Sequence, residues 1–316
     1  MIRELPEVLV LKDRPFELIK PDRQAAAAKK TLRARDIWHH KAVGLESARK
    51  KGFKGTGAGV TIAVLDTGID PTHPELNGRV ASAYTFDVAN WEAQAMNPSQ
   101  DTEGHGTHVA GLICGKKVGI APGALLFNGV MIPGGFGNLS DFVLALEWAA
   151  SRPEVQIVNM SAGIRGYLPE MREPVADLLR VGVLPVIATG NEGRNQTRSP
   201  GNYNEVLSIG ASTRKNLIAS FSSGGTIVAD NHQYYVPDLV APGQNVYSSV
   251  MGGGYESWNG TSMATPIVSG LAALILEKHP TMTVPDLQDT LLITCQDLGF
   301  DANRQGAGLV QVKAAV

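Results

Sequence analysis

The chain has 316 residues, of which 43% are hydrophobic and 18% are charged, and its formal net charge is −2. This length allows one large core or two modest ones. The nearly balanced charge argues against a nucleic acid or a membrane surface as the main partner. Cys114 and Cys295 each stand in an apolar stretch without a CxxC partner. We therefore expect buried free thiols rather than a metal site, with a disulfide as the alternative.

Residues 1–45 differ from the rest of the chain, because they are charged and contain no glycine before Gly44. Their longest apolar run, residues 8–11, is shorter than the roughly 7–15 residues of a signal-peptide core. No later stretch reaches the roughly 20 apolar residues of a membrane span. We therefore predict a cytoplasmic protein, or a secreted one if a leader has been removed. The expected organisation is an N-terminal extension, residues 1–45, and one domain, residues 46–316.

Apolar runs of strand length alternate with stretches of helical character. The strand-like runs are residues 60–65, 155–160, 183–189, 206–209 and 238–241, and the helix-like stretches are residues 142–150, 170–180, 265–278 and 283–294. Ser140 and Asp141 are candidate caps of the first helix, and Thr283 with Pro285 begins the last. Strands that are apolar throughout and alternate with helices are typical of a sheet covered on both faces. The predicted fold class is α/β, a mostly parallel, doubly wound sheet with helices on both faces.

Three short blocks carry side chains suited to nucleophilic catalysis. Asp66 ends the first strand-like run, His105 begins the stretch GHGTHVAG, and Ser262 stands in NGTSMATP just before the long apolar helix. A serine hydroxyl needs a base, and an imidazole with a pKa near ~6.5 suits that task. A carboxylate can hold the imidazole in the required tautomer. Functional residues of parallel sheets gather at the carboxyl ends of strands, where Asp66 is expected.

These blocks resemble the signature blocks of the subtilisin-like serine proteases, the subtilase family, which carry Asp, His and Ser in this order. The resemblance extends from about residue 55 to the C-terminus. It implies a serine endopeptidase with Asp66, His105 and Ser262 as its catalytic triad, and an acyl-enzyme on Ser262. It also implies that His108 is structural and that Asn191, in ATGNEG, supplies an oxyanion-hole amide opposite the backbone N–H of Ser262.

The same resemblance implies where a polypeptide substrate binds in extended conformation. The residues expected to line the pocket for the residue before the scissile bond are Ser161, Ala162, Gly163, Ala188, Thr189 and Gly190. Gly134, Gly135 and Phe136, followed by Gly137, are expected to form an edge that pairs with the substrate main chain. Glu192 is interpreted as a solvated surface residue, the alternative being a rim charge that favours a basic side chain. No nucleic-acid or membrane partner is expected.

The sequence departs from the family where many subtilisins carry a calcium loop. The helix after His105 is expected to continue through residues 112–122 without an Asn-rich insert, and Lys116 and Lys117 stand where oxygen ligands are needed. Glu75 matches a family ligand position, but calcium takes about 6–8 oxygens. We therefore expect no cofactor for the chemistry and no strong calcium site, while weaker structural calcium sites stay open. Residues 224–237 are expected to form a long surface loop.

Several alternatives remain. Residues 1–45 are either an inhibitory segment, with residues 9–11 or 16–19 in the cleft, or a packing arm that supports the sheet. Acyl transfer to an amine would use the same motifs as hydrolysis. A non-catalytic binding module is disfavoured by the intact catalytic residues. A nucleotide site at residues 55–59 is rejected, because that glycine-rich run precedes a strand and the phosphate fingerprint must follow one.

Overall fold

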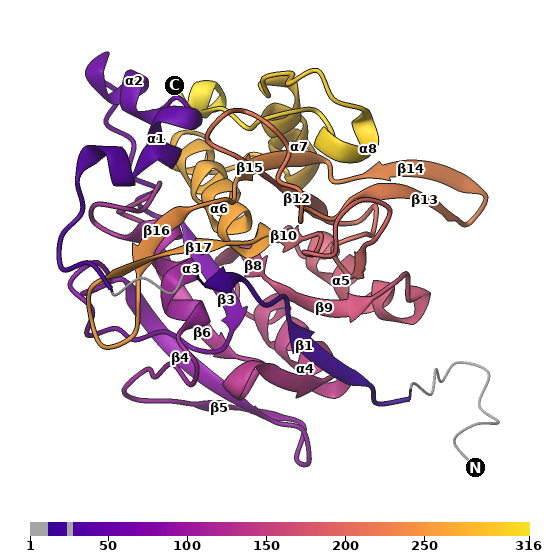
Figure 1. The fold of residues 1–316 in the computed structure, drawn as a ribbon. Coiled ribbons are helices and arrows are strands. Elements are labelled where there is room, and N and C mark those ends of the chain that lie inside the picture. The colour runs from indigo at the N-terminus through magenta and orange to yellow at the C-terminus, as the bar shows by residue number, and fades with distance from the viewer. Residues whose placement is uncertain (1–11, 24–27) are drawn as a thin grey trace, which may run out of the picture.

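The computed structural model describes residues 12–23 and 28–316. The central strands are β3 (Thr61–Asp66), β4 (Val80–Asp87), β5 (Glu92–Ala95), β6 (Leu125–Val130), β8 (Val155–Met160), β10 (Leu184–Ala188), β12 (Leu207–Ser212) and β15 (Leu239–Pro242). They form an eight-stranded sheet in the order β15-β12-β10-β8-β3-β6-β4-β5 (Figure 1). Every pair is parallel except β4 with the edge strand β5. The predicted α/β fold with a mostly parallel sheet is confirmed.

Helices cover both faces of this sheet. One core contains α3 (His105–Cys114), α6 (Thr261–Lys278) and α7 (Val284–Ile293), and the other contains α4 (Leu139–Ala150) and α5 (Arg172–Arg180). In β3, Ile62 and Val64 belong to the first core, whereas Ala63 and Leu65 belong to the second. A strand covered on both faces must be apolar at every position, as the run in β3 is.

Shorter elements surround the sheet and bring the N-terminal residues into the fold. They are β1 (Pro15–Leu18), β2 (Asp22–Arg23), β7 (Phe136–Asn138), β9 (Ala162–Arg165), β11 (Arg198–Ser199), β13 (Gly225–Ala229), β14 (His232–Val236), β16 (Val246–Ser249), β17 (Tyr255–Asn259), α1 (Trp38–Ala42), α2 (Leu45–Lys50) and α8 (Ala302–Gln305). A four-stranded sheet has the order β11-β9-β1-β7, and a three-stranded sheet has the order β16-β17-β2. In Figure 1 the indigo strand β1 crosses the molecule beside β9. An N-terminal segment is thus an inner strand of a sheet whose other members lie more than 100 residues away.

Two helices begin earlier than their sequence patterns predicted. In α4 the cap is Asn138 rather than Ser140, and the Asp141 carboxylate accepts a hydrogen bond from the Asn138 N–H. The Ser140 N–H and hydroxyl both donate to Asp13, a residue 127 positions away. Helix α6 begins at Thr261 rather than at residue 265, so Ser262 lies inside its first turn. In both cases the helix end is stabilised by a segment distant in sequence.

Within residues 224–237, residues 225–236 form the hairpin β13–β14. The prediction of a surface loop there is therefore wrong. Its turn residues, Asp230 and Asn231, have φ angles of 51° and 62°. Such left-handed pairs are typical of tight hairpin turns. The hairpin is fixed by an ion pair from Asp230 to Arg172 of α5. Its alternation is hidden in the sequence because its exposed positions include the apolar Val228 and the aromatic Tyr235.

Three further expectations concern α3, the cysteines and the membrane. Helix α3 ends at Cys114, with Gly115 as its cap, so the expected continuation through residue 122 is wrong. Both cysteines are free thiols, as expected, but only Cys114 is fully buried, and Cys295 is partly buried. Burial raises the pKa of each thiol to about 12. In the part of the chain that the structure describes, no helix is long and apolar enough to cross a membrane.

Candidate active site

Asp66 and His105 meet at the carboxyl end of β3. His105 Nδ1 lies 2.8 Å and 2.9 Å from the two carboxylate oxygens of Asp66, and both side chains are fully buried. Because an ionised carboxylate only accepts hydrogen bonds, Nδ1 carries the proton and Nε2 has the lone pair. That Nε2 is buried and has no hydrogen-bond partner among the described residues. The pair therefore presents a base whose accepting nitrogen is uncommitted.

The start of α3 is held by Asp101, which the sequence reading did not single out. Its carboxylate accepts hydrogen bonds from the backbone N–H groups of Glu103, Gly104 and Thr107, at 2.8–3.0 Å. A carboxylate at a helix N-terminus satisfies orphan donors and complements the helix dipole. His105 is the first residue of this helix, so Asp101 fixes its position. The sequence feature that could have predicted this contact is an Asp four residues before the histidine.

Gly106 explains why a glycine follows His105. A Cβ on Gly106 would come within 2.0 Å of the Gly68 carbonyl oxygen, in the turn that follows Asp66. Real Cβ atoms do not approach backbone oxygens so closely. Only a glycine therefore lets α3 approach the end of β3 closely enough for His105 to reach Asp66.

His108, the competing histidine, is placed in a structural position. Its ring stacks on Trp258 at 4.2 Å between centroids, and its Nε2 contacts the Glu256 carbonyl oxygen at 3.2 Å. Burial lowers its pKa well below the ordinary value. A buried neutral imidazole with a backbone partner has a packing function here.

Ser262 and Asn191 both contact the N-terminal segment. The Ser262 hydroxyl donates to the Ile19 carbonyl oxygen at 3.0 Å, and Asn191 Nδ2 donates to the Lys20 carbonyl oxygen at 3.1 Å. The Asn191 Oδ1 atom accepts from the Thr261 N–H at 2.9 Å, which caps α6. One asparagine side chain thus holds the helix that carries Ser262 and also points an amide donor into the cleft.

The N-terminal segment lies in the cleft as an extended strand. Strand β1 pairs antiparallel with β7, where Glu17 lies opposite Phe136, and with β9, where Glu17 lies opposite Gly163. The Ile19 N–H donates to the Ser161 carbonyl oxygen at 3.0 Å. The structure thus brings both expected substrate-binding edges together around residues 15–19. Residues 9–11, the other segment expected in the cleft, lie outside the described residues.

The expected edge segment at Gly134 is only partly a strand. Gly134 and Gly135 form a 3-10 helix with Pro133, and Gly134 has a φ of 66°. Only residues 136–138 pair with β1. A Cβ on Gly135 would lie 3.7 Å from the Leu18 side chain, so this glycine lines the cleft without pairing.

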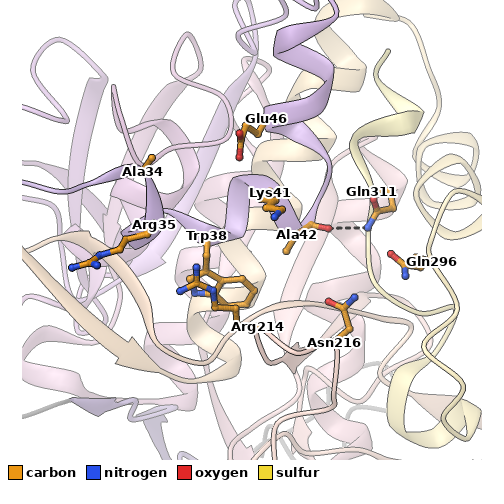
Figure 2. Close-up of a pocket in the computed structure, with 10 residues that line it drawn as sticks. All are labelled: Ala34, Arg35, Trp38, Lys41, Ala42, Glu46, Arg214, Asn216, Gln296 and Gln311. Carbon is orange, nitrogen blue, oxygen red and sulfur yellow. Dashed lines mark hydrogen bonds between the residues drawn. The ribbon is translucent and has the colours of Figure 1, made fainter.

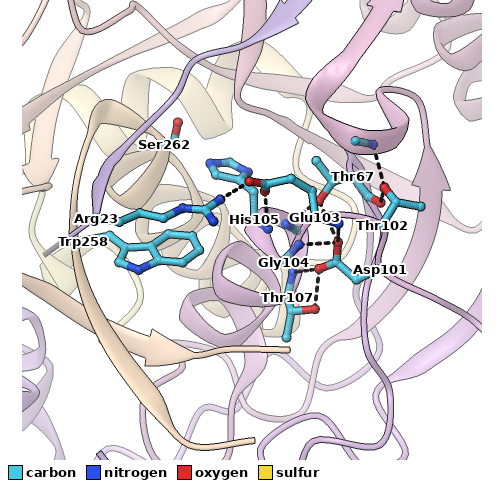
Figure 3. A network of polar contacts seen from close by, with 12 residues as sticks. Arg23, Thr67, Asp101, Thr102, Glu103, Gly104, His105, Thr107, Trp258 and Ser262 are labelled. Atoms are coloured by element: carbon cyan, nitrogen blue, oxygen red, sulfur yellow. Dashed lines mark hydrogen bonds and ion pairs between the residues drawn. The ribbon is translucent and has the colours of Figure 1, made fainter. Parts of the chain in front are cut away.

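Beyond Ser262, the N-terminal segment pairs with β17 and contacts the start of α3, the helix that carries His105 (Figure 3). The Arg23 guanidinium lies over the Trp258 ring, 4.2 Å from its centroid, and forms an ion pair with Glu103. Glu103 Oε2 also accepts from the His105 backbone N–H at 3.1 Å. Asp22 accepts from the Asn259 side chain at 2.9 Å. The described part of the extension is therefore bound on both sides of Ser262.

Glu192 does not occupy a solvated surface position, contrary to the sequence interpretation. Its carboxylate forms an ion pair with Arg198 at 2.5 Å, and the two side chains are 16% and 8% exposed. This pair lies next to the expected pocket walls, since Arg198 also donates to the Gly163 carbonyl oxygen at 2.9 Å. Burial acts to raise the pKa of Glu192, but the hydrogen bonds and charge of Arg198, together with smaller contributions, lower that pKa below its usual value. Sequence reasoning missed Arg198, because nothing local marks an arginine that folds back into a pocket.

Glu75, which matches a calcium-ligand position of the family, accepts hydrogen bonds from other residues of the chain. Its carboxylate accepts hydrogen bonds from the Tyr255 hydroxyl at 2.7 Å and from the Lys117 N–H at 2.6 Å. Within residues 12–23 and 28–316, no group of three or more His, Cys, Asp or Glu side chains could hold a metal ion.

A separate cavity of about 560 Å³ lies beside α1 (Figure 2). Its lining includes Trp38, Arg35 and Arg214, and the Gln311 amide donates to the Ala42 carbonyl oxygen at 3.1 Å across its edge. None of the expected catalytic or substrate-binding residues lines it. The catalytic constellation is elsewhere, so this cavity is not the candidate active site.

An Asp–His pair, a serine in the first turn of a helix and a nearby amide donor define the site of a serine hydrolase. The chain matches the model described as the subtilase family over residues 57–308. The chain therefore belongs to the subtilase family of serine endopeptidases.

Several subtilisins are similar in sequence to most of this chain. It is 37% identical over 270 residues to Subtilisin E of Bacillus subtilis (strain 168), which covers 82% of this chain and 66% of that protein. It is 37% identical over 284 residues to Subtilisin Savinase of Lederbergia lenta, which covers 88% of this chain and 97% of that protein. Fervidolysin from Fervidobacterium pennivorans, described as a keratinolytic enzyme related to subtilisin, gives a TM-score of 0.73 at 26% identity. That match covers 95% of this chain but only 50% of the fervidolysin chain.

Proposed function

We propose that this chain is a serine endopeptidase that hydrolyses peptide bonds through an acyl-enzyme on Ser262. The observation that carries the proposal is the buried Asp66–His105 pair, whose Nε2 is unpartnered among the described residues. It lies at a cleft in which Ser262 and Asn191 each bind a carbonyl oxygen of an extended segment. Family membership supports the same reaction.

The chemistry follows from the roles of these side chains. His105 Nε2 takes the Ser262 hydroxyl proton as the oxygen attacks the carbonyl carbon, and Asp66 stabilises the imidazolium that forms. Asn191 Nδ2 and the Ser262 backbone N–H bind the oxyanion. His105 then gives its proton to the leaving amine, and water hydrolyses the acyl-enzyme by the same route. Side chains and water are sufficient, so the proposed reaction needs no cofactor.

The proposed substrate is a polypeptide bound in extended conformation between β7 and β9. The support is β1, which pairs with both strands at once. Such pairing uses main-chain groups and is compatible with many sequences. The nearly balanced charge does not favour a nucleic acid or a membrane surface as the partner.

We further propose that residues 1–45 form an inhibitory extension of a peptidase domain that spans residues 46–316. The described part supports this, because residues 15–23 occupy the cleft on both sides of Ser262. We propose that the Ile19–Lys20 bond resists cleavage because of its position. Ser262 binds the Ile19 carbonyl oxygen, while Asn191 binds the next carbonyl, so the Ile19 oxygen lies outside the oxyanion position. Phe16 also belongs to a hydrophobic core, so the segment contributes to packing as well.

Mass spectrometry of peptide products tests the proposed reaction. The full chain and its Ser262→Ala variant are incubated with a long unstructured polypeptide for many hours. Hydrolysis gives fragments whose masses sum to the substrate plus one water per cut, and the variant gives none. Products that have lost no atoms and gained no water, or cleavage by the variant, would contradict hydrolysis on Ser262. The first of these outcomes would favour acyl transfer to an amine.

A further inference from the structure

A polar cavity of about 620 Å³ lies beside the segment in the cleft, and its lining joins the extension to the expected pocket walls. The lining residues are Glu17, Leu18, Ile19, Lys20, Arg165, Asn191, Glu192, Gln196 and Arg198. Ile19 pairs through its N–H with Ser161, an expected pocket wall, and its carbonyl oxygen accepts from Ser262. We therefore take its side chain as the stand-in for the substrate residue before the scissile bond, even though its carbonyl oxygen lies outside the oxyanion position. Ile19 is only 1% exposed but belongs to neither hydrophobic core. This subsite therefore buries an apolar occupant among polar and charged groups.

Arg198 and Glu192 form the buried wall of this cavity. A Cβ on Gly163 would lie 3.3 Å from Arg198 Cβ, and one on Gly190 would lie 2.5 Å from Glu192 Oε2. The two expected pocket walls are therefore separated by this ion pair rather than by open apolar space. A large aromatic ring would have to pack against a guanidinium and a carboxylate.

The hydrogen bonds of Glu192 leave its carboxylate fully engaged. Oε1 accepts from Arg198 Nε at 2.7 Å and from Arg198 NH2 at 2.5 Å, and it lies 3.6 Å from Arg165 Nε. Oε2 accepts from the Asn191 N–H at 3.0 Å and from the Ser223 hydroxyl at 3.2 Å. A substrate ammonium would have to displace one of these donors. The sequence-based alternative of Glu192 as a rim charge for basic side chains is therefore not favoured.

Outside the extension, the charged residues that line this cavity are two arginines, Arg165 and Arg198, and one carboxylate, Glu192. Arg165 is 75% exposed, and its contact with Glu192 is long, so much of its guanidinium is available. In the extension, Glu17 and Lys20 both line the same cavity, and the Lys20 ammonium lies over the Phe136 ring, 4.8 Å from its centroid. A positive wall favours an anion by ordinary charge complementarity.

We propose that this cavity is a specificity pocket that selects an acidic side chain, Glu or Asp, at the residue before the scissile bond, with Arg165 and Arg198 as its determinants. This inference rests on the proposed function. Arg165 supplies the direct charge-assisted hydrogen bond. Arg198, held by Glu192 and Gly163, keeps the wall rigid and offsets the negative charge of Glu192, which leaves the charge of Arg165 uncompensated. A Lys or Arg side chain meets two guanidinium groups, while Glu192, the carboxylate of this lining outside the extension, is already engaged.

The experiment measures how fast peptide probes label Ser262. Three tripeptidyl diphenyl phosphonates are compared whose last residue is an analogue of Glu, Lys or Phe. Ser262 Oγ forms a bond to phosphorus, the P–O bond to one phenoxide breaks, and that phenoxide leaves as phenol with the serine proton. Intact mass of the full chain gives the rate of each reaction. The full-chain Phe16→Ala variant is measured in parallel, because a loosened extension gives the probes easier access.

We expect the Glu probe to label about tenfold faster than the Lys and Phe probes in either protein. The Arg165→Gln variant should lose about three- to tenfold of the Glu rate and keep the other two within about twofold. Arg214→Gln, at the distant cavity of Figure 2, is the matched control and should change none of the three. Added salt should reduce the Glu preference, since Arg165 is exposed.

Three outcomes would overturn the proposed specificity. They are equal or faster labelling by the Lys or Phe probe, an Arg165→Gln effect shared by all three probes, and no peptide labelling in a protein that a small alkyl fluorophosphonate does label. Failure of the alkyl fluorophosphonate itself would instead contradict the proposed function. The two proposals therefore fail in distinguishable ways.

Discussion

At the scale of single residues, the site depends on side chains that bind two partners each. Asp66 uses both carboxylate oxygens toward His105 and also accepts from the Thr67 N–H at 2.7 Å. Asn191 uses its oxygen to cap α6 and its nitrogen to bind a carbonyl in the cleft. The position of the catalytic serine and the proposed stabilisation of the oxyanion are thus coupled through one amide.

Substitution of Asn191 separates these two contributions. We expect Asn191→Ala to lower kcat by about 100- to 1,000-fold, a range established on a subtilisin and carried over here. The loss of the cap to Thr261 should also cost about 1 kcal/mol of unfolding free energy. Asn191→Asp keeps the accepting oxygen, so it should retain most of that stability while it still loses activity. Steady-state kinetics and thermal unfolding measure the two effects, and equal kcat for Asn191→Ala and wild type would contradict the assigned role.

At the scale of elements, five of the eight central strands and most of the described helices could be predicted, because apolar runs and helical periodicity are local properties. The strands β4, β5 and β6 were not singled out. The triad and Asn191 could be singled out because each stands in a compact motif. Helix starts were less predictable, since α4 is capped with the help of Asp13 and α6 with the help of Asn191. The hairpin β13–β14 was missed because its exposed positions mix polar residues, such as Thr226 and Gln233, with the apolar Val228, so no clear alternation is visible in the sequence. Arg198 was missed because its role depends on Gly163 and Glu192, which approach it only in the fold.

The edge of the sheet contains a carboxylate whose protonation should affect stability. Asp238 precedes β15 and accepts a hydrogen bond from the Ser208 N–H at 2.7 Å, and burial raises its pKa to about 7. The unfolded value is near ~3.9, so the folded state binds the proton more tightly. The stability that this proton gives the folded state is therefore complete below pH ~4. It is lost as the pH rises through about 7.

The Asp238→Asn variant tests this pH dependence. Its neutral amide oxygen can still accept from the Ser208 N–H, so the variant should unfold at a higher temperature than wild type at pH 8 and at a similar one at pH 4. We expect a gain of about 1 kcal/mol, or a few degrees, at the higher pH. Thermal unfolding at several pH values measures it. A difference between the two proteins that does not depend on pH would contradict a raised pKa.

At the scale of the whole molecule, the N-terminal extension and the peptidase domain form a single structure. Phe16 stacks on Phe142 of α4 at 4.9 Å, and Arg23 reaches the start of α3 through Glu103. The sequence showed that residues 1–45 differ from the rest, and it left inhibition and packing as equal alternatives. The proposal of inhibition rests on pairing between segments more than 100 residues apart, which no local pattern reports.

Weakening the extension should raise activity if it is inhibitory. Phe16→Ala removes a fully buried ring. Such substitutions lower the free energy of unfolding by about 3–5 kcal/mol. We expect peptidase activity of this full-length variant to rise by about 10- to 100-fold, because the cleft opens more often. A chain that starts near Trp38 should be at least as active. Leu217→Ala, at a half-exposed position, is the control.

Equal rates for the full-length protein, Phe16→Ala and the shortened chain would leave only the packing role. Thermal unfolding of the same samples excludes loss of folded protein as the reason for a low rate. A lower unfolding temperature together with unchanged activity is the result that a packing arm predicts.

The most direct test of the proposed chemistry is labelling of the protein by an alkyl fluorophosphonate, followed by intact mass and peptide mapping. The buried Asp66–His105 pair should make Ser262 the single modified serine, and Ser262→Ala should remain unlabelled. His105→Ala should slow labelling by at least about 1,000-fold. Modification at another serine, or labelling that persists in Ser262→Ala, would contradict Ser262 as the nucleophile.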